Sequence, residues 1–298
     1  MPRMTHTPDT SPQPDSPSAP GTSPHQGTDR PHRRTVLRGA VAGTGLAALG
    51  AVTASGASAA PAAPAAAPAS AGSWGAEERS GEPRGPHIGV LLFDGYTLLD
   101  PVGPSEVLCR LPDARLTMIG ERRGPVVSDT RDVSVHAERS MDEIRRLDVL
   151  VVPGGGERGT LGAIGNPRML RWIARMDRHT TWTTSVCTGS LILGAAGLLR
   201  GRPATTHWNS TPYLADYGAR YQADRYVRSG KYLTAAGVSS GVDMALLLAA
   251  RMSGETVARA IQLAIEYDPQ PPFDSGSAEH ASPELKALAL RLLVDSQS

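Results

Sequence analysis

The residues with the clearest chemical potential lie in the pentapeptide SVCTG at 185–189, between an apolar run and an Ala-, Gly- and Leu-rich segment. Cys187 would end a strand, and the segment that follows has helical composition. A cysteine at a strand-to-helix turn lies near a helix N-terminus, which favours thiolate over thiol. Cysteine is also among the most buried residue types, so the pattern alone leaves nucleophile and core residue as equal alternatives.

Two other turns are expected to share a pocket with Cys187. Asp94-Gly95 follows the apolar run HIGVLLF, and the segment Pro153–Gly156 follows LDVLVV. The carboxyl ends of neighbouring parallel strands lie at one edge of a sheet, where ligands bind. The backbone N–H of Thr188 would point into this pocket and stabilise a developing anion.

The elements that must position these residues alternate between strand and helix. Apolar runs predict buried strands at 87–93, 147–152 and 181–187. Between the last two, Asn166 is suited to cap a helix and Pro167 to occupy its first position. Such alternation predicts a mostly parallel sheet with helices on both faces, the α/β class.

The later part of the chain predicts four more elements. We expect a short strand at 202–208 and a hairpin at 225–237 that turns at Ser229-Gly230. A helix is predicted at 239–254, with Ser240 and Asp243 as its capping box. Residues 281–295 predict a final amphipathic helix.

The N-terminal part has the composition of a targeting region. Residues 1–32 are rich in Pro, Ser, Thr and Asp and are predicted to be disordered. Arg33-Arg34, a weakly apolar segment and the small residues Ala57-Ser58-Ala59 together predict a twin-arginine signal peptide at 33–59, cleaved after Ala59. An uncleaved membrane anchor is the alternative. Residues 60–86 would form a linker, and the mature protein would be periplasmic or extracellular, without stable membrane insertion.

Charge and cysteine content narrow the function classes. The net charge is +1 and 20% of residues are charged, which gives no reason to expect a nucleic-acid partner. The chain has two cysteines, too few for a disulfide framework, and Cys109 is expected in the core on the apolar face of a helix. His207 has no partner at metal-ligand spacing, so no metal is expected.

Four segments carry a family resemblance. These are VLLFDGYTLLDPVGPSEVL, VVPGGG, SVCTGSLILGAAGLLRGRPATTHW and LTAAGVSSGVDMALLLAA. In order and spacing they resemble the DJ-1/PfpI superfamily over residues 87–275, and within it the isonitrile hydratase branch. Residues 276–298 lie outside this match as a C-terminal helical segment. The resemblance implies a flavodoxin-like three-layer α/β/α sandwich, a homodimer, and a cysteine on a strained nucleophile elbow.

The resemblance also implies roles for particular residues. Cys187 matches the nucleophile, Thr188 the threonine that the hydratase branch requires, and Asp100 its catalytic aspartate. Gly155 matches the glycine whose N–H completes the anion pocket, and His207 matches a histidine near the cysteine. For Asp100 an N-cap before Pro101 is the alternative, and for His207 a strand-end histidine bonded to backbone.

The function implied is the addition of water to a small isonitrile, which gives an N-substituted formamide without cofactor or metal. PfpI-type peptidases have a histidine directly after the cysteine, where this chain has Thr188, so peptidase activity is not expected. Two alternatives stay open. One is a glyoxalase- or deglycase-like enzyme, and the other is a redox-sensing stress protein that uses an oxidisable Cys187.

Overall fold

The computed structural model describes residues 85–297, so the predicted disordered segment, signal peptide and most of the linker lie outside the described residues. The strands are β1 (His87–Leu91), β2 (Arg115–Gly120), β3 (Gly124–Val127), β4 (Ser134–Ala137), β5 (Arg139–Ser140), β6 (Val149–Val152), β7 (Trp182–Val186), β8 (Pro203–Ala204), β9 (Arg220–Tyr221), β10 (Tyr226–Ser229) and β11 (Tyr232–Ala235). The α-helices are α1 (Leu99–Leu108), α2 (Glu157–Ile164), α3 (Pro167–Asp177), α4 (Gly189–Ala195), α5 (Ser240–Ser253), α6 (Glu255–Ala264) and α7 (Pro283–Asp295). Two 3₁₀ segments, η1 (Met141–Glu143) and η2 (Trp208–Tyr217), complete the set.

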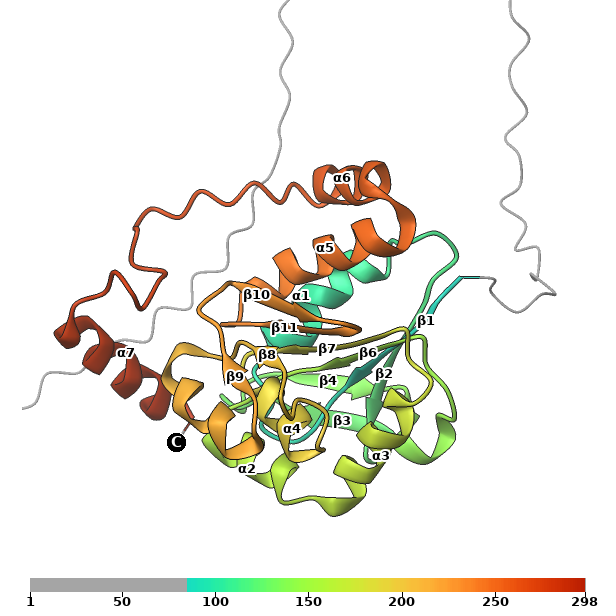
Figure 1. The fold of residues 1–298 in the computed structure, drawn as a ribbon, viewed down its shortest axis with the longest axis horizontal. Helices are drawn as coiled ribbons and strands as arrows, with labels where there is room; N and C mark the ends of the chain where they lie inside the picture. Colours follow the sequence, from blue (N-terminus) through green and yellow to red (C-terminus); the bar gives the residue numbers. More distant parts are fainter. Residues whose placement is uncertain (1–84, 298) are drawn as a thin grey trace, which may run out of the picture. The chain divides into compact units, whose positions relative to one another are not determined.

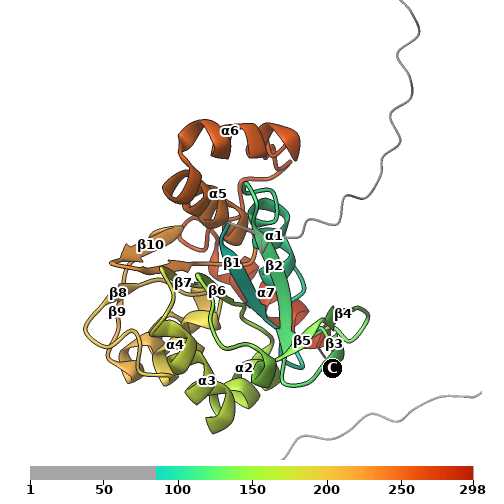
Figure 2. The same ribbon diagram turned by 90° about the vertical axis from the view of Figure 1, so that its right-hand side faces the viewer.

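Seven of the strands form one central sheet in the order β10-β11-β7-β6-β1-β2-β5. Every neighbouring pair in it is parallel except the hairpin β10–β11. Helices α1, α5 and α6 cover one face of the sheet, and α2, α3 and α4 cover the other (Figures 1 and 2). The predicted three-layer, mostly parallel α/β sandwich is confirmed.

The central strands are buried on both faces, which explains why they are continuous apolar runs. In β6 all four residues are buried. Val149 and Val151 belong to the core cluster that includes α5, whereas Leu150 and Val152 belong to the cluster on the opposite face. Since successive side chains of a strand alternate in direction, only a strand covered by helices on both sides reads as unbroken hydrophobic sequence.

Several predicted local signals form as expected. The Asn166 side chain accepts hydrogen bonds from the N–H groups of Arg168 and Met169 at 3.1 Å each, which caps α3. Gly230 has φ +64° in the turn between β10 and β11, a conformation that glycine adopts without steric penalty. The strand predicted at 202–208 is shorter than expected, because only β8 is extended and η2 begins at Trp208.

Two predictions about single residues are wrong. Cys109 is exposed, because α1 ends at Leu108 and the cysteine follows as its C-cap. The predicted capping box at Ser240 does not form, since the Asp243 carboxylate pairs with Arg225 and accepts a 2.9 Å hydrogen bond from the Tyr267 hydroxyl. The Asp243 carboxylate thus bonds to side chains distant in sequence instead of to its own helix terminus.

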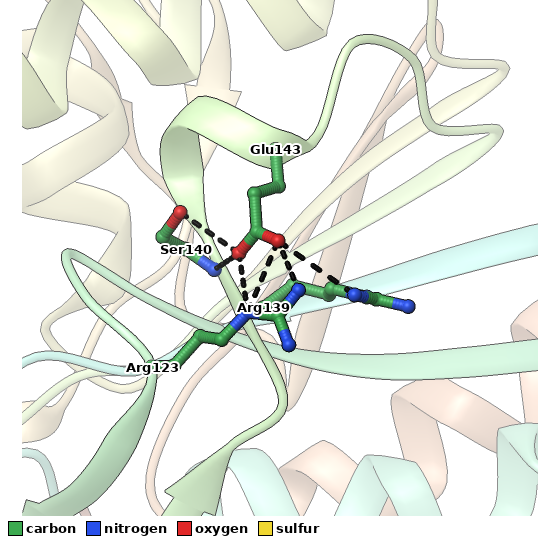
Figure 3. Close-up of polar contacts among 4 residues, drawn as sticks. All are labelled: Arg123, Arg139, Ser140 and Glu143. Carbon is green, nitrogen blue, oxygen red and sulfur yellow. Dashed lines mark hydrogen bonds and ion pairs between the residues drawn. The ribbon is translucent and has the colours of Figure 1, made fainter.

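A polar junction at Glu143 joins η1 to the neighbouring strands (Figure 3). The Glu143 carboxylate accepts from the Ser140 N–H at 2.8 Å and the Ser140 hydroxyl at 3.0 Å. Arg123 donates to the same carboxylate, and Arg139 lies 3.6 Å from it. The hydrogen bonds from Arg123 and Ser140, with that of Arg123 the strongest, hold the pKa of Glu143 well below its usual range. Residues from before β3, from β5 and from η1 are thereby tied together at the surface.

The predicted C-terminal helix forms as α7, with the Ser282 hydroxyl accepting from the Leu285 N–H at 3.2 Å. None of its residues is buried within the described part of the chain. Its end reaches the β6–α2 turn, where the Gln297 side chain lies against Gly156. No helix in residues 85–297 has the length and apolarity needed to cross a membrane.

Candidate active site

Cys187 occupies a strained turn between β7 and α4. Its φ of +57° is unusual for a residue with a side chain and marks an elbow held by its surroundings. The Cys187 N–H donates to the Ala235 carbonyl at 3.1 Å, and its own carbonyl accepts from Thr206 Oγ1 at 3.1 Å and Ser190 Oγ at 3.2 Å. These hydrogen bonds from β11, from α4 and from the loop between β8 and η2 compensate the backbone strain.

Glycine is required on both sides of this elbow. A Cβ on Gly189 would lie 2.2 Å from the Val152 carbonyl oxygen, so α4 begins in backbone contact with the end of β6. A Cβ on Gly154 would lie 2.5 Å from Thr188 N and 2.9 Å from Cys187 Cβ. The β6 turn and the elbow therefore approach more closely than any larger residue permits.

Asp100 is fully buried in the first turn of α1, and its carboxyl group points across to the β6 turn. Its Oδ2 accepts a 2.8 Å hydrogen bond from the Gly154 N–H. The other oxygen, Oδ1, falls outside hydrogen-bonding geometry with every described residue, although the Cys187 thiol lies close enough to lower the pKa of the carboxyl. The carboxyl group therefore does not cap α1, which removes the alternative reading of Asp100.

The loop after β1 fixes Asp100 against this turn through backbone contacts. Gly95, with φ +82°, accepts a 3.2 Å hydrogen bond from the Gly156 N–H. The Thr97 N–H donates to the Gly154 carbonyl at 3.1 Å, and the Thr97 carbonyl accepts from the Asp100 N–H at 3.0 Å. The three turns that follow β1, β6 and β7 thus meet at one edge of the sheet, as predicted.

Burial dominates the electrostatics of the site. It raises the pKa of Asp100 to about 8, against the lowering effects of the Gly154 N–H and the Cys187 thiol. Burial and the negative charge of Asp100 raise the pKa of Cys187 well above its usual value, against the hydrogen bonds of Thr188. Near neutral pH, a thiol therefore faces a protonated carboxyl group.

This result corrects the expectation of a resting thiolate. Cys187 is 4% exposed, and Asp100 has no exposed surface. Helix α4 spans seven residues, and its N-terminal field is outweighed by the loss of water around the sulfur. Any thiolate must form during a reaction, when a proton leaves the pair.

Thr188 has its hydroxyl in a network that also involves the β6 turn. The Gly155 N–H donates to Thr188 Oγ1 at 3.0 Å, so this N–H is aimed at the threonine rather than into an open anion pocket. The Thr188 N–H and hydroxyl both lower the pKa of Cys187, as expected of groups that stabilise negative charge on its sulfur. The structure therefore brings together Cys187, Asp100, Thr188 and Gly155.

His207 is placed differently from the other predicted residues. Its Nδ1 lies 2.6 Å from Asn209 Oδ1, and burial lowers its pKa. Within residues 85–297 no hydrogen bond joins the His207 side chain to Cys187 or to a backbone group, so its proposed supporting role stays a prediction. The residue before it, Thr206, is the one that contacts the elbow.

Sequence reasoning missed two side chains near the site. Thr160, buried on α2, lies with its Oγ1 2.8 Å from Thr188 Oγ1. Asp129, beyond β3, accepts a 2.6 Å hydrogen bond from Thr97 Oγ1, and its charge raises the pKa of both Asp100 and Cys187. Neither belongs to a recognisable motif. In the described residues, no cluster of three His, Cys, Asp or Glu side chains could hold a metal ion.

Comparisons with known proteins match this architecture. The chain is 42% identical over 194 residues to an isonitrile hydratase of Pseudomonas putida, an alignment that covers 65% of this chain and 84% of that protein. It is 31% identical over 181 residues to the HTH-type transcriptional regulator CdhR of Pseudomonas aeruginosa, with 56% and 51% covered.

A solved structure supports the same assignment. The crystal structure of a ThiJ/PfpI family protein from Pseudomonas syringae superposes with a TM-score of 0.67 at 35% identity and covers 75% of this chain and 93% of that one. The model of the DJ-1/PfpI family matches residues 86–251, which include all three turns of the site. The chain belongs to the DJ-1/PfpI family.

Proposed function

We propose that this protein is a cysteine-dependent enzyme that adds water to a small isonitrile and releases an N-substituted formamide. One observation carries the proposal: a buried carboxyl group with a pKa of about 8 faces an elbow cysteine. The 42% identity to an isonitrile hydratase supports the choice of substrate class. The reaction requires an acid, a nucleophile and a water, and the first two are supplied by Asp100 and Cys187.

In the first half of the reaction the isonitrile R–N≡C becomes covalently attached to the enzyme. Asp100, protonated at neutral pH, donates its proton to the terminal carbon, which becomes electrophilic. The Cys187 sulfur bonds to this carbon, and its proton returns to the Asp100 carboxylate. The product is the thioimidate R–N=CH–S–Cys187, and the carboxyl group ends protonated as it began.

In the second half, water releases the product. Water adds to the thioimidate carbon while the nitrogen gains a proton, which gives R–NH–CH(OH)–S–Cys187. The carbon–sulfur bond then breaks, the hydroxyl proton is lost, and the sulfur takes up a proton. The formamide R–NH–CHO leaves and the thiol is restored. Asp100 exchanges protons in both halves, which a carboxyl group does most effectively when its pKa is near the working pH.

Thr188 stabilises the charge that this chemistry creates on sulfur. Its N–H and hydroxyl both lower the pKa of Cys187, and their effect grows when the sulfur becomes anionic in a site without water. The Gly155 N–H holds the Thr188 hydroxyl in place. No step in this scheme requires a metal or an organic cofactor.

The decisive experiment uses Cys187→Ala and Asp100→Asn in the full chain, assayed with cyclohexyl isocyanide. We expect loss of the isocyanide infrared band and formation of the formamide with the parent. Turnover should be abolished by Cys187→Ala and reduced about 100- to 10,000-fold by Asp100→Asn, the usual contribution of a general acid.

The exposed Cys109 provides the matched control through Cys109→Ser, since it follows the last residue of α1 whereas Asp100 lies in the first turn of that helix. This variant should retain parental turnover. Activity that survives Cys187→Ala would contradict the proposal, as would turnover of methylglyoxal without turnover of the isocyanide. The redox-sensor alternative is disfavoured because burial keeps the Cys187 thiol protonated, and thiols oxidise through the thiolate.

A further inference from the structure

The exposed face of helix α3 carries a row of arginines. One side of the helix is apolar and buried against the core. On the other side four exposed arginines recur at spacings of three and four residues, which places them on one face: Arg168, Arg171, Arg175 and, at the C-cap, Arg178. The single carboxylate of the helix, Asp177, is buried and pairs with Lys231 at 3.1 Å. The charged groups on the exposed face of α3 are therefore all positive.

Helix stability does not explain this row. In α6, Arg259 pairs with Glu255 four residues before it, an arrangement that stabilises a helix. In α3 the residue four positions before Arg175 is Arg171, and like charges at this spacing repel. Arg168 lies in the first turn, close to the positive end of the helix dipole, and that turn has no acidic residue. Each of these features destabilises α3 slightly.

The row continues onto the segment that follows η1. Arg145 and Arg175 line an open cleft of about 370 Å³ together with Asp142 and Ile144. Asp142 pairs with Arg168 at 2.6 Å. Within residues 85–297 no ion pair is formed by the other members of the group, which are Arg145, Arg171, Arg175 and Arg178.

We call these five arginines the arginine face: Arg145, Arg168, Arg171, Arg175 and Arg178. With Asp142 it has a net charge of +4, whereas the whole chain has a net charge of +1. Helix α3 lies at the edge of the domain, on the opposite side of the sheet from α5 and α6 (Figures 1 and 2). The positive charge is thus concentrated on one side of the domain, where an anionic partner can reach it.

The composition of the arginine face indicates the kind of partner. Guanidinium groups bind phosphate oxygens in pairs of parallel hydrogen bonds. Protein interfaces usually bury an apolar core, and single-stranded nucleic acids stack on aromatic side chains. No large apolar side chain of η1 or α3 is exposed. The headgroups of anionic phospholipids require neither feature, and four to eight basic residues on an amphipathic helix are typical of their recognition.

We propose that the arginine face attaches this protein to a membrane surface rich in anionic phospholipid, with α3 lying along the headgroups. The signal peptide predicted at 33–59 would bring the chain to a membrane, where such a surface is available. The attachment depends on charge and inserts no apolar side chain, so it is reversible and weakened by salt. It does not involve Cys187 or Asp100 and is independent of the proposed function.

The test is sedimentation of the full chain with vesicles of phosphatidylcholine and phosphatidylglycerol in equal parts. We expect Arg171→Gln combined with Arg175→Gln to lower the partition coefficient about 25-fold, which is about fivefold for each arginine. Sodium chloride at about 1 M, where the Debye length is about 3 Å, should release the parent. Binding to vesicles of phosphatidylcholine alone should not differ between the variant and the parent.

The matched control combines Arg251→Gln with Arg259→Gln. It removes two exposed arginines from α5 and α6, on the other side of the sheet, and changes the net charge by the same amount. The N-terminal region is identical in all of these proteins. The control should bind as the parent does.

An unchanged partition coefficient in the α3 variant, or an equal loss in the control, would overturn the proposal. Tighter binding of the parent to duplex DNA than to the vesicles, lost in the α3 variant, would assign the face to nucleic acid instead. Turnover of cyclohexyl isocyanide does not enter the measurement, so either proposal can fail while the other stands.

Discussion

Asp100 and Cys187 form a pair in which each group makes ionisation of the other harder. Both are buried, and the charge of Asp100 raises the pKa of the thiol. In such a pair the protons leave in steps that belong to the pair rather than to either residue. Since the pKa of the carboxyl group is raised to about 8 and that of the thiol lies higher still, both groups hold their protons at neutral pH. The pair is therefore a proton donor at neutral pH, which is what protonation of an isonitrile carbon requires.

The pH dependence of turnover tests this assignment. Since the acid that we propose is the protonated form of Asp100, kcat/KM should be constant below about pH 7 and fall about tenfold per unit above pH 8. Initial rates with cyclohexyl isocyanide between pH 5.5 and pH 9.5 give the profile, and Cys109→Ser should reproduce it. A rate that rises through pH 8 would instead indicate that formation of a thiolate limits the reaction, and the assignment of Asp100 as acid would be wrong.

At this scale the sequence predicted which residues meet but not their protonation. Cys187 and Asp100 were identifiable from the turn pattern and the family resemblance. The resting charge state depends on burial, because the lost hydration of two neighbouring groups outweighs the local N–H groups. The contact of Thr160 with Thr188 could not be predicted, because it arises only from the folding of α2 against the elbow.

Among the elements, the close approach of the β6 turn to the elbow sets the geometry of the site. Gly154 is buried between Thr188 and Cys187 and donates its N–H to Asp100. One residue therefore contacts all three of the side chains to which we assign chemistry. A change that moves this turn moves the acid relative to the nucleophile.

The substitution Gly154→Ala should separate the Asp100 carboxyl group from the Cys187 sulfur. Its methyl group would lie 2.5 Å from Thr188 N and Oγ1, so the turn must shift. We expect kcat/KM to fall about 100-fold, and the free energy of unfolding to fall by about 1–3 kcal/mol. Gly162→Ala on α2 is the control, since a Cβ there meets nothing within 4 Å and alanine favours a helix by up to about 1 kcal/mol. Equal activity of the two variants would contradict this account.

Strands and helices were predictable where the hydrophobic pattern is unambiguous over the whole element. The runs that became β1, β6 and β7 are apolar throughout because helices cover both of their faces. Predictions failed where an element ends or where a polar group has a distant partner. The exposure of Cys109 depends on the residue at which α1 ends, and the partner of Asp243 is Arg225, which is distant in sequence. Neither feature can be recognised from the residues next to Cys109 or Asp243.

In the whole domain, polar groups concentrate at opposite edges of the sheet. At the edge away from the elbow, the buried Asp177 carboxylate accepts from Thr183 Oγ1 at 2.7 Å and Tyr232 Oη at 3.1 Å and pairs with Lys231 at 3.1 Å. This cluster is satisfied by its own contacts. At the other edge Asp100 keeps one oxygen without a hydrogen bond, which is a cost to stability that the site carries.

The cost of that carboxyl group should depend on pH. Between the ordinary aspartate value near 4 and about 8, the folded state holds a proton that the unfolded state loses, so stability falls as pH rises. Across this window the contribution lost is on the order of 5 kcal/mol. Asp100→Asn should therefore gain stability relative to the parent as pH rises from 5 to 8, measured by urea unfolding.

The control for this measurement is Gly162→Ala on α2, which adds or removes no titratable group. Its stability difference from the parent should not change with pH over the same window. A constant difference between Asp100→Asn and the parent would mean that the carboxyl group is already ionised in the folded protein at pH 5.

The burial of the elbow has a consequence for the shape of the reacting group. A sulfur in a residue that is 4% exposed is less accessible to a broad, planar peptide bond than to a narrow, linear group. An isocyano group is a linear rod two atoms long whose reactive carbon is its tip. We therefore expect the enzyme to accept isonitriles with bulky substituents on the nitrogen and to reject substrates whose reactive carbon carries a wide group. The width of the reacting group, and not the size of the whole molecule, would then decide which substrates are used.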